Sequence, residues 1–277
     1  LATSSAASDV YKRQIPSKTL RQNAVRISQL RDHQDLFSFS LREDIAMASL
    51  IQNMDQVINA HDSYITDQLS RNAIEQSHGA ARFIDKHTIE VRSPGGKSRQ
   101  FTTQNVIIAT GSYPRQADNV PVDHEHIYDS DSILTQIYLP KSLTVLGGGV
   151  IASEYASIFL ALGVNVTMID KYPRPLGFLD SDLTDEFVRV FEAKGGRFIG
   201  NTEVESVAWN GVDCVETRLS SGEVIVSDKL LSAAGRIANV KGLNIEAAGL
   251  ALSEQGIIPV DQHCRTLVEN IYAAGDV

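Results

Sequence analysis

The chain has 277 residues, with 34 Asp and Glu against 25 Lys and Arg, so its formal net charge is −9. At about 100–200 residues per domain, this length predicts two domains, each able to bury a hydrophobic core. Hydrophobic residues make up 43% and charged residues 21%, which excludes a wholly disordered chain. The acidic balance argues against nucleic-acid binding, because no basic excess exists to neutralise phosphates. No apolar run approaches the roughly 18 residues that a membrane span needs.

The two cysteines, Cys214 and Cys264, lie far apart in the sequence. They predict neither a disulfide framework nor a metal cluster, and we interpret both as structural. Such sparse cysteine usage is typical of a reducing cytoplasm, where we expect this protein to be located.

The first stretch, Leu1–Gln14, has no clear periodicity and lacks the apolar core of a signal peptide. It is either a native flexible arm or a non-native segment fused to a truncated coding sequence. Well-patterned sequence begins abruptly at Ile15, which favours the second interpretation. The chain stops at Ala-Ala-Gly-Asp-Val, without a terminal helix or polar tail. We therefore expect an internal fragment of a longer protein.

The first half of the chain mixes helices and short strands. A helical pattern starts at Ile15 and reaches Leu30, and a longer one runs from about Glu43 to Gln76, with a break near His61 as the alternative. From Gly79 the period falls towards two. This predicts short strands around Ala81, Phe83, Thr88–Val91, Phe101 and Val106–Ala109, with a turn at Pro94–Gly96.

The second half alternates strands and helices before a stretch of antiparallel strands. The predicted strands are Ser142–Leu146, Val164–Ile169, Arg197–Ile199, Glu203–Trp209, Val212–Leu219, Glu223–Val226 and Lys229–Ala234. The predicted helices are Val150–Leu162 and Leu183–Lys194. Strand, helix and strand in this order predict an α/β fold with a parallel sheet.

A glycine-rich turn carries the chemistry. Gly147-Gly148-Gly149-Val150-Ile151-Ala152 matches the pattern G-x-G-x-x-G/A, follows a predicted strand and opens a predicted helix. Gly147 permits the tight turn, Gly149 lets the backbone approach a pyrophosphate, and Ala152 allows close packing of helix on strand. The free N–H groups and the dipole of the helix then favour phosphates. This context predicts dinucleotide binding.

Asp170 ends the next predicted strand, where a carboxylate accepts hydrogen bonds from the adenosine ribose and favours NAD(H). Lys171 and Arg174 follow directly and could receive the 2′-phosphate of NADP(H), although each is also typical of a solvated turn. The choice between the two nucleotides therefore stays open. Glu154, inside the helix, is either an exposed residue or a cofactor-facing carboxylate that needs a partner.

Five strings occur in an order that resembles a known family: Ile15-Pro-Ser-Lys18, Ala109-Thr-Gly-Ser112, the glycine turn with Glu154, Ala234-Gly-Arg236 and Tyr272-Ala-Ala-Gly-Asp276. Together they resemble the two-dinucleotide flavoprotein disulfide reductases, the FAD-dependent pyridine nucleotide-disulfide oxidoreductases. Softer strings, such as Gly79-Ala-Ala-Arg-Phe83 and Tyr128-Asp-Ser-Asp-Ser-Ile-Leu134, are similar to the soluble, Si-specific NAD(P)+ transhydrogenases within that group. The resemblance covers about Ile15 to Val277.

The resemblance implies two Rossmann-like domains and a role for each matched residue. Lys18 would lie near the flavin N5 and pair with Glu154, which gives that carboxylate its partner. The residues that would contact FAD are Ala81, Thr110, Gly111, Ser112 and Asp276. Those that would line the NAD(P) site are Gly147, Gly148, Gly149, Val150, Ile151, Ala152, Asp170, Val204 and Gly235. Val150 stands where related reductases often place a gating Tyr, which implies readier access for nicotinamide.

By this resemblance, residues 15–137 form a partial FAD-binding domain, 138–269 the NAD(P)-binding domain, and 270–277 a return to the FAD-binding domain. Residues 1–14 are the non-native or disordered arm. The family's first glycine fingerprint, its Cys-x-x-x-x-Cys pair and its C-terminal dimerisation domain have no match in this sequence. We expect a homo-oligomeric parent protein that assembles through that C-terminal domain.

The implied reaction moves hydride equivalents from NADPH through FAD to NAD+, with both nicotinamide dinucleotides as substrates. Such transfer requires no side-chain acid or base, so we nominate no catalytic residue and no metal ligand. One alternative is a lipoamide dehydrogenase type of disulfide oxidoreductase. The other is that the chain by itself is a non-catalytic NAD(H)-binding module, which is what we expect of the isolated fragment.

Overall fold

The computed structural model describes residues 15–32, 47–50 and 54–277, so the predicted arm at 1–14 lies outside the described residues. Contacts divide the chain into two compact units. Unit 1 contains Asp55–Tyr113 and Arg236–Val277; unit 2 contains Pro114–Gly235 and the described part of Arg13–Met54. These limits differ from the predicted domain limits at 137/138 and 269/270. The chain after Gly235 packs in the core of unit 1, so the second limit lies at 235/236 rather than at 269/270.

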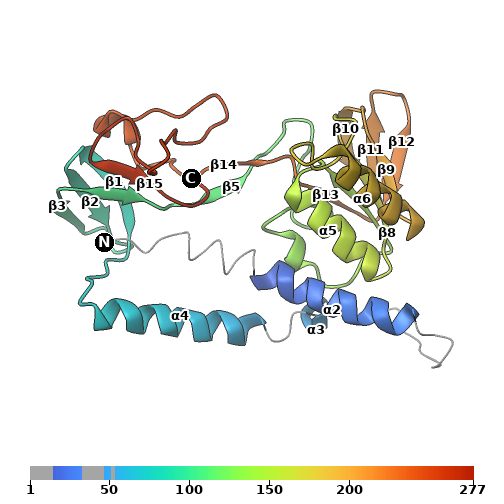
Figure 1. The fold of residues 1–277 in the computed structure, drawn as a ribbon, viewed down its shortest axis with the longest axis horizontal. Helices are drawn as coiled ribbons and strands as arrows, with labels where there is room; N and C mark the ends of the chain where they lie inside the picture. The colour runs from blue at the N-terminus through green and yellow to red at the C-terminus, as the bar shows by residue number, and fades with distance from the viewer. Residues whose placement is uncertain (1–14, 33–46, 51–53) are drawn as a thin grey trace. The chain divides into compact units, whose positions relative to one another are not determined.

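Unit 2 is an α/β unit built on one parallel sheet (Figure 1). Its helices are α2 (Ile15–Asp32), α3 (Met47–Leu50), α5 (Val150–Ala161), α6 (Ser181–Ala193) and the short 3-10 helix η2 (Ile133–Thr135). Its strands are β6 (Ile127–Asp129), β7 (Ser142–Leu146), β8 (Asn165–Ile169), β9 (Arg197–Ile199), β10 (Val204–Trp209), β11 (Val215–Leu219), β12 (Val224–Ser227) and β13 (Lys229–Ser232).

The parallel sheet of unit 2 has the strand order β6-β13-β7-β8-β9. From β7 the chain winds through α5 to β8 and through α6 to β9 on one side, and β13 joins β7 on the other side. The strand order therefore reverses between β7 and β13. In open α/β sheets, ligands bind at the carboxyl ends of the two strands that flank such a switch point.

Both faces of this sheet are covered, as a parallel sheet requires. On one face, Ala152, Tyr155 and Phe159 of α5 share a buried core with Val145 of β7 and Met168 of β8. On the other face, the antiparallel strands β10, β11 and β12 contribute the apolar side chains Val207, Val215, Leu219 and Ile225. Two buried layers thus hold the strand ends in place.

Helix α5 is apolar around most of its circumference because it is packed on two sides. Leu20 and Ala24 of α2 belong to the same core as Ala156 of α5 and are fully buried. The two helices lie side by side in Figure 1. This packing explains why Ala, Ser and Ile occupy positions on α5 where an exposed helix would carry charges.

The described part of unit 1 is formed by two chain segments, one on each side of the Pro114–Gly235 segment of unit 2 in the sequence. Its elements are α4 (Met54–Arg71), β1 (Ala80–Asp85), β2 (Thr88–Arg92), β3 (Ser98–Thr102), β4 (Val106–Ile108), β5 (Ser112–Pro114), β14 (Arg236–Ala238), η3 (Ile245–Ala248) and β15 (Ile271–Ala273). Strands β1, β2 and β3 form an antiparallel meander, β15 pairs with β4 in parallel, and β14 pairs with β5. Phe83, Ile108, Ile245 and Ile271 are the centre of its core.

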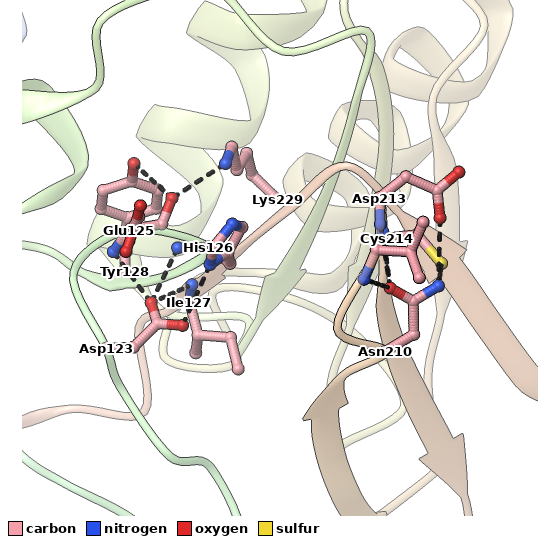
Figure 2. A network of polar contacts seen from close by, with 10 residues as sticks. Asp123, Glu125, His126, Ile127, Tyr128, Asn210, Asp213, Cys214 and Lys229 are labelled. Carbon is pink, nitrogen blue, oxygen red and sulfur yellow. Dashed lines mark hydrogen bonds and ion pairs between the residues drawn. The ribbon is translucent and has the colours of Figure 1, made fainter.

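Most predicted elements are confirmed, with two informative differences. Helix α4 is continuous through His61, so the alternative break at that residue is wrong; the segment contains no Gly or Pro that could interrupt it. Strand β11 begins at Val215 rather than Val212. The side-chain oxygen of Asn210 accepts hydrogen bonds from the N–H groups of Val212, Asp213 and Cys214, which holds these residues in a turn (Figure 2).

Within the described ranges, no helix combines the length and the apolar character needed to cross a membrane. Cys214 and Cys264 are both free thiols. Burial raises the pKa of the Cys214 thiol and the neighbouring carboxylate of Asp213 raises it further, which favours the neutral thiol over the thiolate.

Candidate functional site

The glycine turn joins β7 to α5 at the switch point of the sheet. Gly147 has φ +110°, and a Cβ at this position would lie 2.7 Å from the carbonyl oxygen of Ala233 at the end of β13. A Cβ on Gly148 would overlap the carboxylate of Asp170. Gly147 therefore accepts only glycine, because its backbone conformation and the end of β13 both exclude a side chain, and a side chain at Gly148 would displace the Asp170 carboxylate.

Gly149 is different, because it is free to face an incoming group. It has φ −75°, and an added Cβ would meet nothing within 4 Å. Gly149 is the N-cap of α5 and makes no side-chain cap, so the first-turn N–H groups of the helix are left to an external acceptor. An anion is the group that the N-terminus of a helix favours. Val150 is exposed here and Ala152 is fully buried against the sheet.

Asp170 follows β8 and lies against the glycine turn. Burial raises the pKa of its carboxyl, and the backbone N–H groups of Tyr172 and Lys171, together with the charge of Lys171, partly oppose that rise. The carboxylate is half-buried, so it retains acceptor positions that face the cavity described next. A hydroxyl-bearing ligand such as a ribose suits it well.

A cavity of about 1000 Å³ lies within unit 2 at these strand ends. Six of the predicted site residues line it together: Gly147, Gly148, Gly149, Asp170, Val204 and Gly235. Val150, Ile151, Ala152 and Glu154 of α5 are not part of its lining. The cavity is large enough for a dinucleotide and combines an open helix N-terminus with a carboxylate at the next strand end. It therefore fits the group that the glycine turn predicts.

Sequence reasoning did not place some of the lining residues in the site. Asn119 and Val120 come from the segment before β6, Phe178 comes from the loop after β8, and Ser232 comes from the end of β13. Ser232 is buried, and its hydroxyl has no hydrogen-bond partner among the described residues. Ser232 comes two residues before the family string Ala234-Gly-Arg236, and this proximity could have indicated it.

The segment that contributes Asn119 and Val120 is anchored by a compact network beside the cavity. The Asp123 carboxylate accepts hydrogen bonds from the N–H groups of Glu125, His126 and Ile127 at 2.7–2.8 Å (Figure 2). Burial by itself would raise the pKa of Asp123, but these N–H groups outweigh it and lower the pKa. The His126 ring stacks on the indole of Trp209, with 3.7 Å between ring centroids. The network thus ties this segment to β10.

Lys171 and Arg174 line the same cavity beyond Asp170. The Lys171 ammonium lies 5.1 Å from the centre of the Tyr172 ring. The Arg174 guanidinium lies 3.6 Å from the carboxylate of Asp185 on α6. Both side chains are exposed, and the role of either in receiving a 2′-phosphate stays a prediction.

The predicted flavin contacts lie in unit 1. The parallel pairing of β4 with β15 places Thr110, which follows β4, and Asp276, which follows β15, at the same edge of one sheet. Gly111 has φ +68° and its carbonyl accepts a 2.8 Å hydrogen bond from the N–H of Asn239. The buried Thr110 hydroxyl has no hydrogen-bond partner in the part of the chain that the structure describes. This orphaned hydroxyl fits an additional polar group at that edge.

Ser112 and Ala81 complete the predicted flavin set at different places in unit 1. The Ser112 hydroxyl and carbonyl accept hydrogen bonds from the Arg236 guanidinium at 2.9 and 2.7 Å. Ala81 is an exposed residue of β1 that pairs with Val91. The 310 Å³ cavity that Ala81 lines does not include Thr110 or Asp276.

Comparison with known proteins decides the family. The family model described as "Pyridine nucleotide-disulphide oxidoreductase" matches residues 5–277. The chain belongs to this family. The match begins inside the stretch 1–14, which the lack of periodicity predicts to be a separate arm.

Curated relatives of this oxidoreductase family member include the soluble pyridine nucleotide transhydrogenase of Colwellia psychrerythraea. It is 36% identical over 263 residues, which are 95% of this chain and 56% of the relative. The corresponding protein of Marinobacter nauticus is 38% identical over 264 residues, with the same two shares. The chain thus spans about half the length of the curated relatives it matches.

Solved structures of similar fold support the family assignment of this chain. LpdA from Mycobacterium tuberculosis matches with a TM-score of 0.86 and 26% identity, over 97% of this chain and 59% of that one. The HOCl-induced flavoprotein disulfide reductase RclA from Escherichia coli, in its Cu(II) complex, matches with a TM-score of 0.79 and 28% identity, over 95% of this chain and 55% of that one.

The remaining predicted pair, Lys18 and Glu154, lies on the two helices that pack together, α2 and α5. Lys18 is exposed and Glu154 is half-buried. Among the described residues, no ion pair joins these two side chains. The pairing that the resemblance implies is therefore absent from this structure, and the role of Lys18 near a flavin stays a prediction.

Proposed function

We propose that the cavity of unit 2 binds a nicotinamide dinucleotide. The observation that carries the proposal is the conjunction of the uncapped α5 N-terminus, the open face of Gly149 and the half-buried Asp170 carboxylate around one cavity. The pyrophosphate would accept hydrogen bonds from the first-turn N–H groups of α5. Asp170 would accept hydrogen bonds from the adenosine ribose. Val204 and Gly235 would line the remainder of the site.

We further propose that the protein moves hydride equivalents between NADPH and NAD+ with FAD as its cofactor. FAD, when bound, supplies the two-electron chemistry that links the two nicotinamides. Thr110, Gly111, Ser112, Asp276 and Ala81 of unit 1 would bind the flavin. The chain's own task is to hold and orient the dinucleotides, so this proposal needs no catalytic acid or base.

Relatives with the name soluble pyridine nucleotide transhydrogenase support this reaction, and similar structures with disulfide reductase names support the alternative less well. The test of the reaction uses the full-length, FAD-loaded protein that contains this chain, with NADPH as donor, because we expect the isolated chain to be non-catalytic. Reduction of thio-NAD+ that depends on FAD supports the transhydrogenase proposal. Reduction of lipoamide without reduction of thio-NAD+ would overturn it in favour of a dithiol enzyme.

Assembly and location complete the proposal. We infer a homo-oligomeric protein of the cytoplasm, supported by the family resemblance and by the word soluble in the relatives' names. Light scattering coupled to size-exclusion chromatography of the full-length protein, with the C-terminal domain through which the family resemblance implies assembly, tests this: a mass of two or more chains supports it, and a monomer at all concentrations contradicts it.

A further inference from the structure

One arginine of the dinucleotide cavity is held by a residue from outside it. Arg174 lines the cavity in the loop after β8, and its Nη1 lies 3.6 Å from Oδ1 of Asp185 on α6. Asp185 itself does not line the cavity. The Asp185 carboxylate therefore attracts the Arg174 guanidinium towards α6.

The geometry shows that this restraint is weak enough to be released. The side chains of Arg174 and Asp185 are 45% and 63% exposed, and 3.6 Å is too long for a charge-assisted hydrogen bond. Exposed pairs of this kind alter an equilibrium by about fivefold at most. A phosphate dianion that accepts two parallel N–H bonds from a guanidinium competes well against such a partner.

The carboxylates of the cavity give its cations, Arg174 and the neighbouring Lys171, a role in binding a 2′-phosphate. Asp170 stands where the adenosine ribose is expected, and Glu203 is a second carboxylate of the lining. Both repel a 2′-phosphate, so NADP(H) needs a cation at this end of the cavity. NAD(H), whose 2′-hydroxyl donates to a carboxylate, does not.

We propose that Asp185 is a positioning residue that sets the balance between NADP(H) and NAD(H), because it holds Arg174 back from the adenosine 2′ position. This inference rests on the proposed function of the cavity. With Asp185 in place, the loop presents Arg174 only when a 2′-phosphate displaces the carboxylate. One cavity then accepts both nucleotides, as a protein that passes hydride from NADPH to NAD+ requires.

The test compares Asp185→Asn with Glu186→Gln in the full 277-residue chain. Glu186 is the matched control: it is the next residue on α6 and pairs with Arg189, and neither residue lines the cavity. Calorimetric titration with NADP+ and with NAD+ gives the two dissociation constants. We expect Asp185→Asn to tighten NADP+ binding by about three- to fivefold and to leave NAD+ binding within about 1.5-fold. Glu186→Gln should change neither.

A second variant and a matched pair of probes separate the inference from a general electrostatic effect. Arg174→Gln should weaken binding of 2′,5′-ADP by at least about tenfold and leave AMP, which lacks the 2′-phosphate, within about twofold. In the double variant Arg174→Gln/Asp185→Asn, the gain from Asp185→Asn should vanish. A gain that persists without Arg174 would overturn the proposal, because Asp185 would then act only through its charge.

The inference and the proposed function fail in different ways. If the unaltered chain binds neither NAD+ nor NADP+, the proposed function fails. If NAD+ binds, but Asp185→Asn moves both nucleotides equally or moves neither, only the role of Asp185 is overturned. Thermal unfolding of the variants, followed by circular dichroism, shows that each binding change belongs to a folded protein.

Discussion

The two units present similar strand edges and yet differ in how complete a site they form. In unit 2, the turn after β7, the carboxylate after β8 and the end of β13 meet around one 1000 Å³ cavity. In the described part of unit 1, Thr110 and Asp276 share the edge of a sheet of two parallel strands, and Ala81 lies on a separate sheet. Ile107, in the middle of β4, is 62% exposed. Parallel strands are ordinarily buried on both faces, which β4 is not.

The difference shows what a dinucleotide site needs from its surroundings. Unit 2 has a covered five-stranded sheet, so both sides of its glycine turn are fixed by neighbouring strand ends. Unit 1 offers polar groups at a strand edge, including the orphaned Thr110 hydroxyl, without a comparable enclosing frame. We therefore expect nicotinamide dinucleotides to bind to this chain more tightly than FAD.

The largest expected effect is a loss of stability at the glycine turn of unit 2. Gly147→Ala forces a side chain into the left-handed region and against the Ala233 carbonyl, so we expect it to lower the free energy of unfolding by about 2–4 kcal/mol. Gly149→Ala, two residues on, has open space and an ordinary φ and serves as the control. Denaturant titration measures both. Equal stability of the two variants would show that the strand ends do not press on this turn.

A smaller effect on stability is expected at Asp170. Because burial raises its pKa above the ordinary 3.8, the folded protein binds the proton more readily than the unfolded chain, and the ionised carboxyl costs stability at neutral pH. Asp170→Asn should therefore raise the melting temperature at pH 7 by about 1–3 °C, while it weakens NAD+ binding.

The pH dependence gives the sign of this prediction. As the pH falls towards 3.8, Asp170 becomes protonated in the unaltered chain and the advantage of Asp170→Asn should disappear. Asp118→Asn, at an exposed carboxyl, is the control for a general change of charge. A melting temperature that falls in Asp170→Asn at neutral pH would show that the carboxylate is held by favourable contacts rather than penalised by burial.

How much the sequence predicts depends on whether a feature is local. The glycine turn, α5, β8 and Asp170 follow one another within a single βαβ segment, so their periodicity and spacing predict them well. The start of β11 could not be predicted, because the Asn210 side chain competes with the strand for the N–H groups that follow it.

Contacts between distant segments were beyond the sequence. Nothing in the pattern of α6 indicates that Asp185 rather than Asp182 faces Arg174, since both are exposed acidic residues in the same two turns. Likewise, the inclusion of Asn119 and Ser232 in the cavity follows from the strand order, which reverses between β7 and β13. Such neighbours become visible only when the topology is known.

The most direct test of the account is NADH binding to Gly149→Val. The new side chain has an allowed φ and open space, so the fold should persist while the isopropyl group fills the place of the pyrophosphate. Gly95→Val, at an equally open glycine in the turn after β2, is the matched control.

Fluorescence titration with NADH should show binding to the unaltered chain and to Gly95→Val, and a loss of at least about tenfold in Gly149→Val with unchanged thermal unfolding. Affinity in Gly149→Val within about twofold of the unaltered chain would contradict the account, because the dinucleotide would then not lie on this turn.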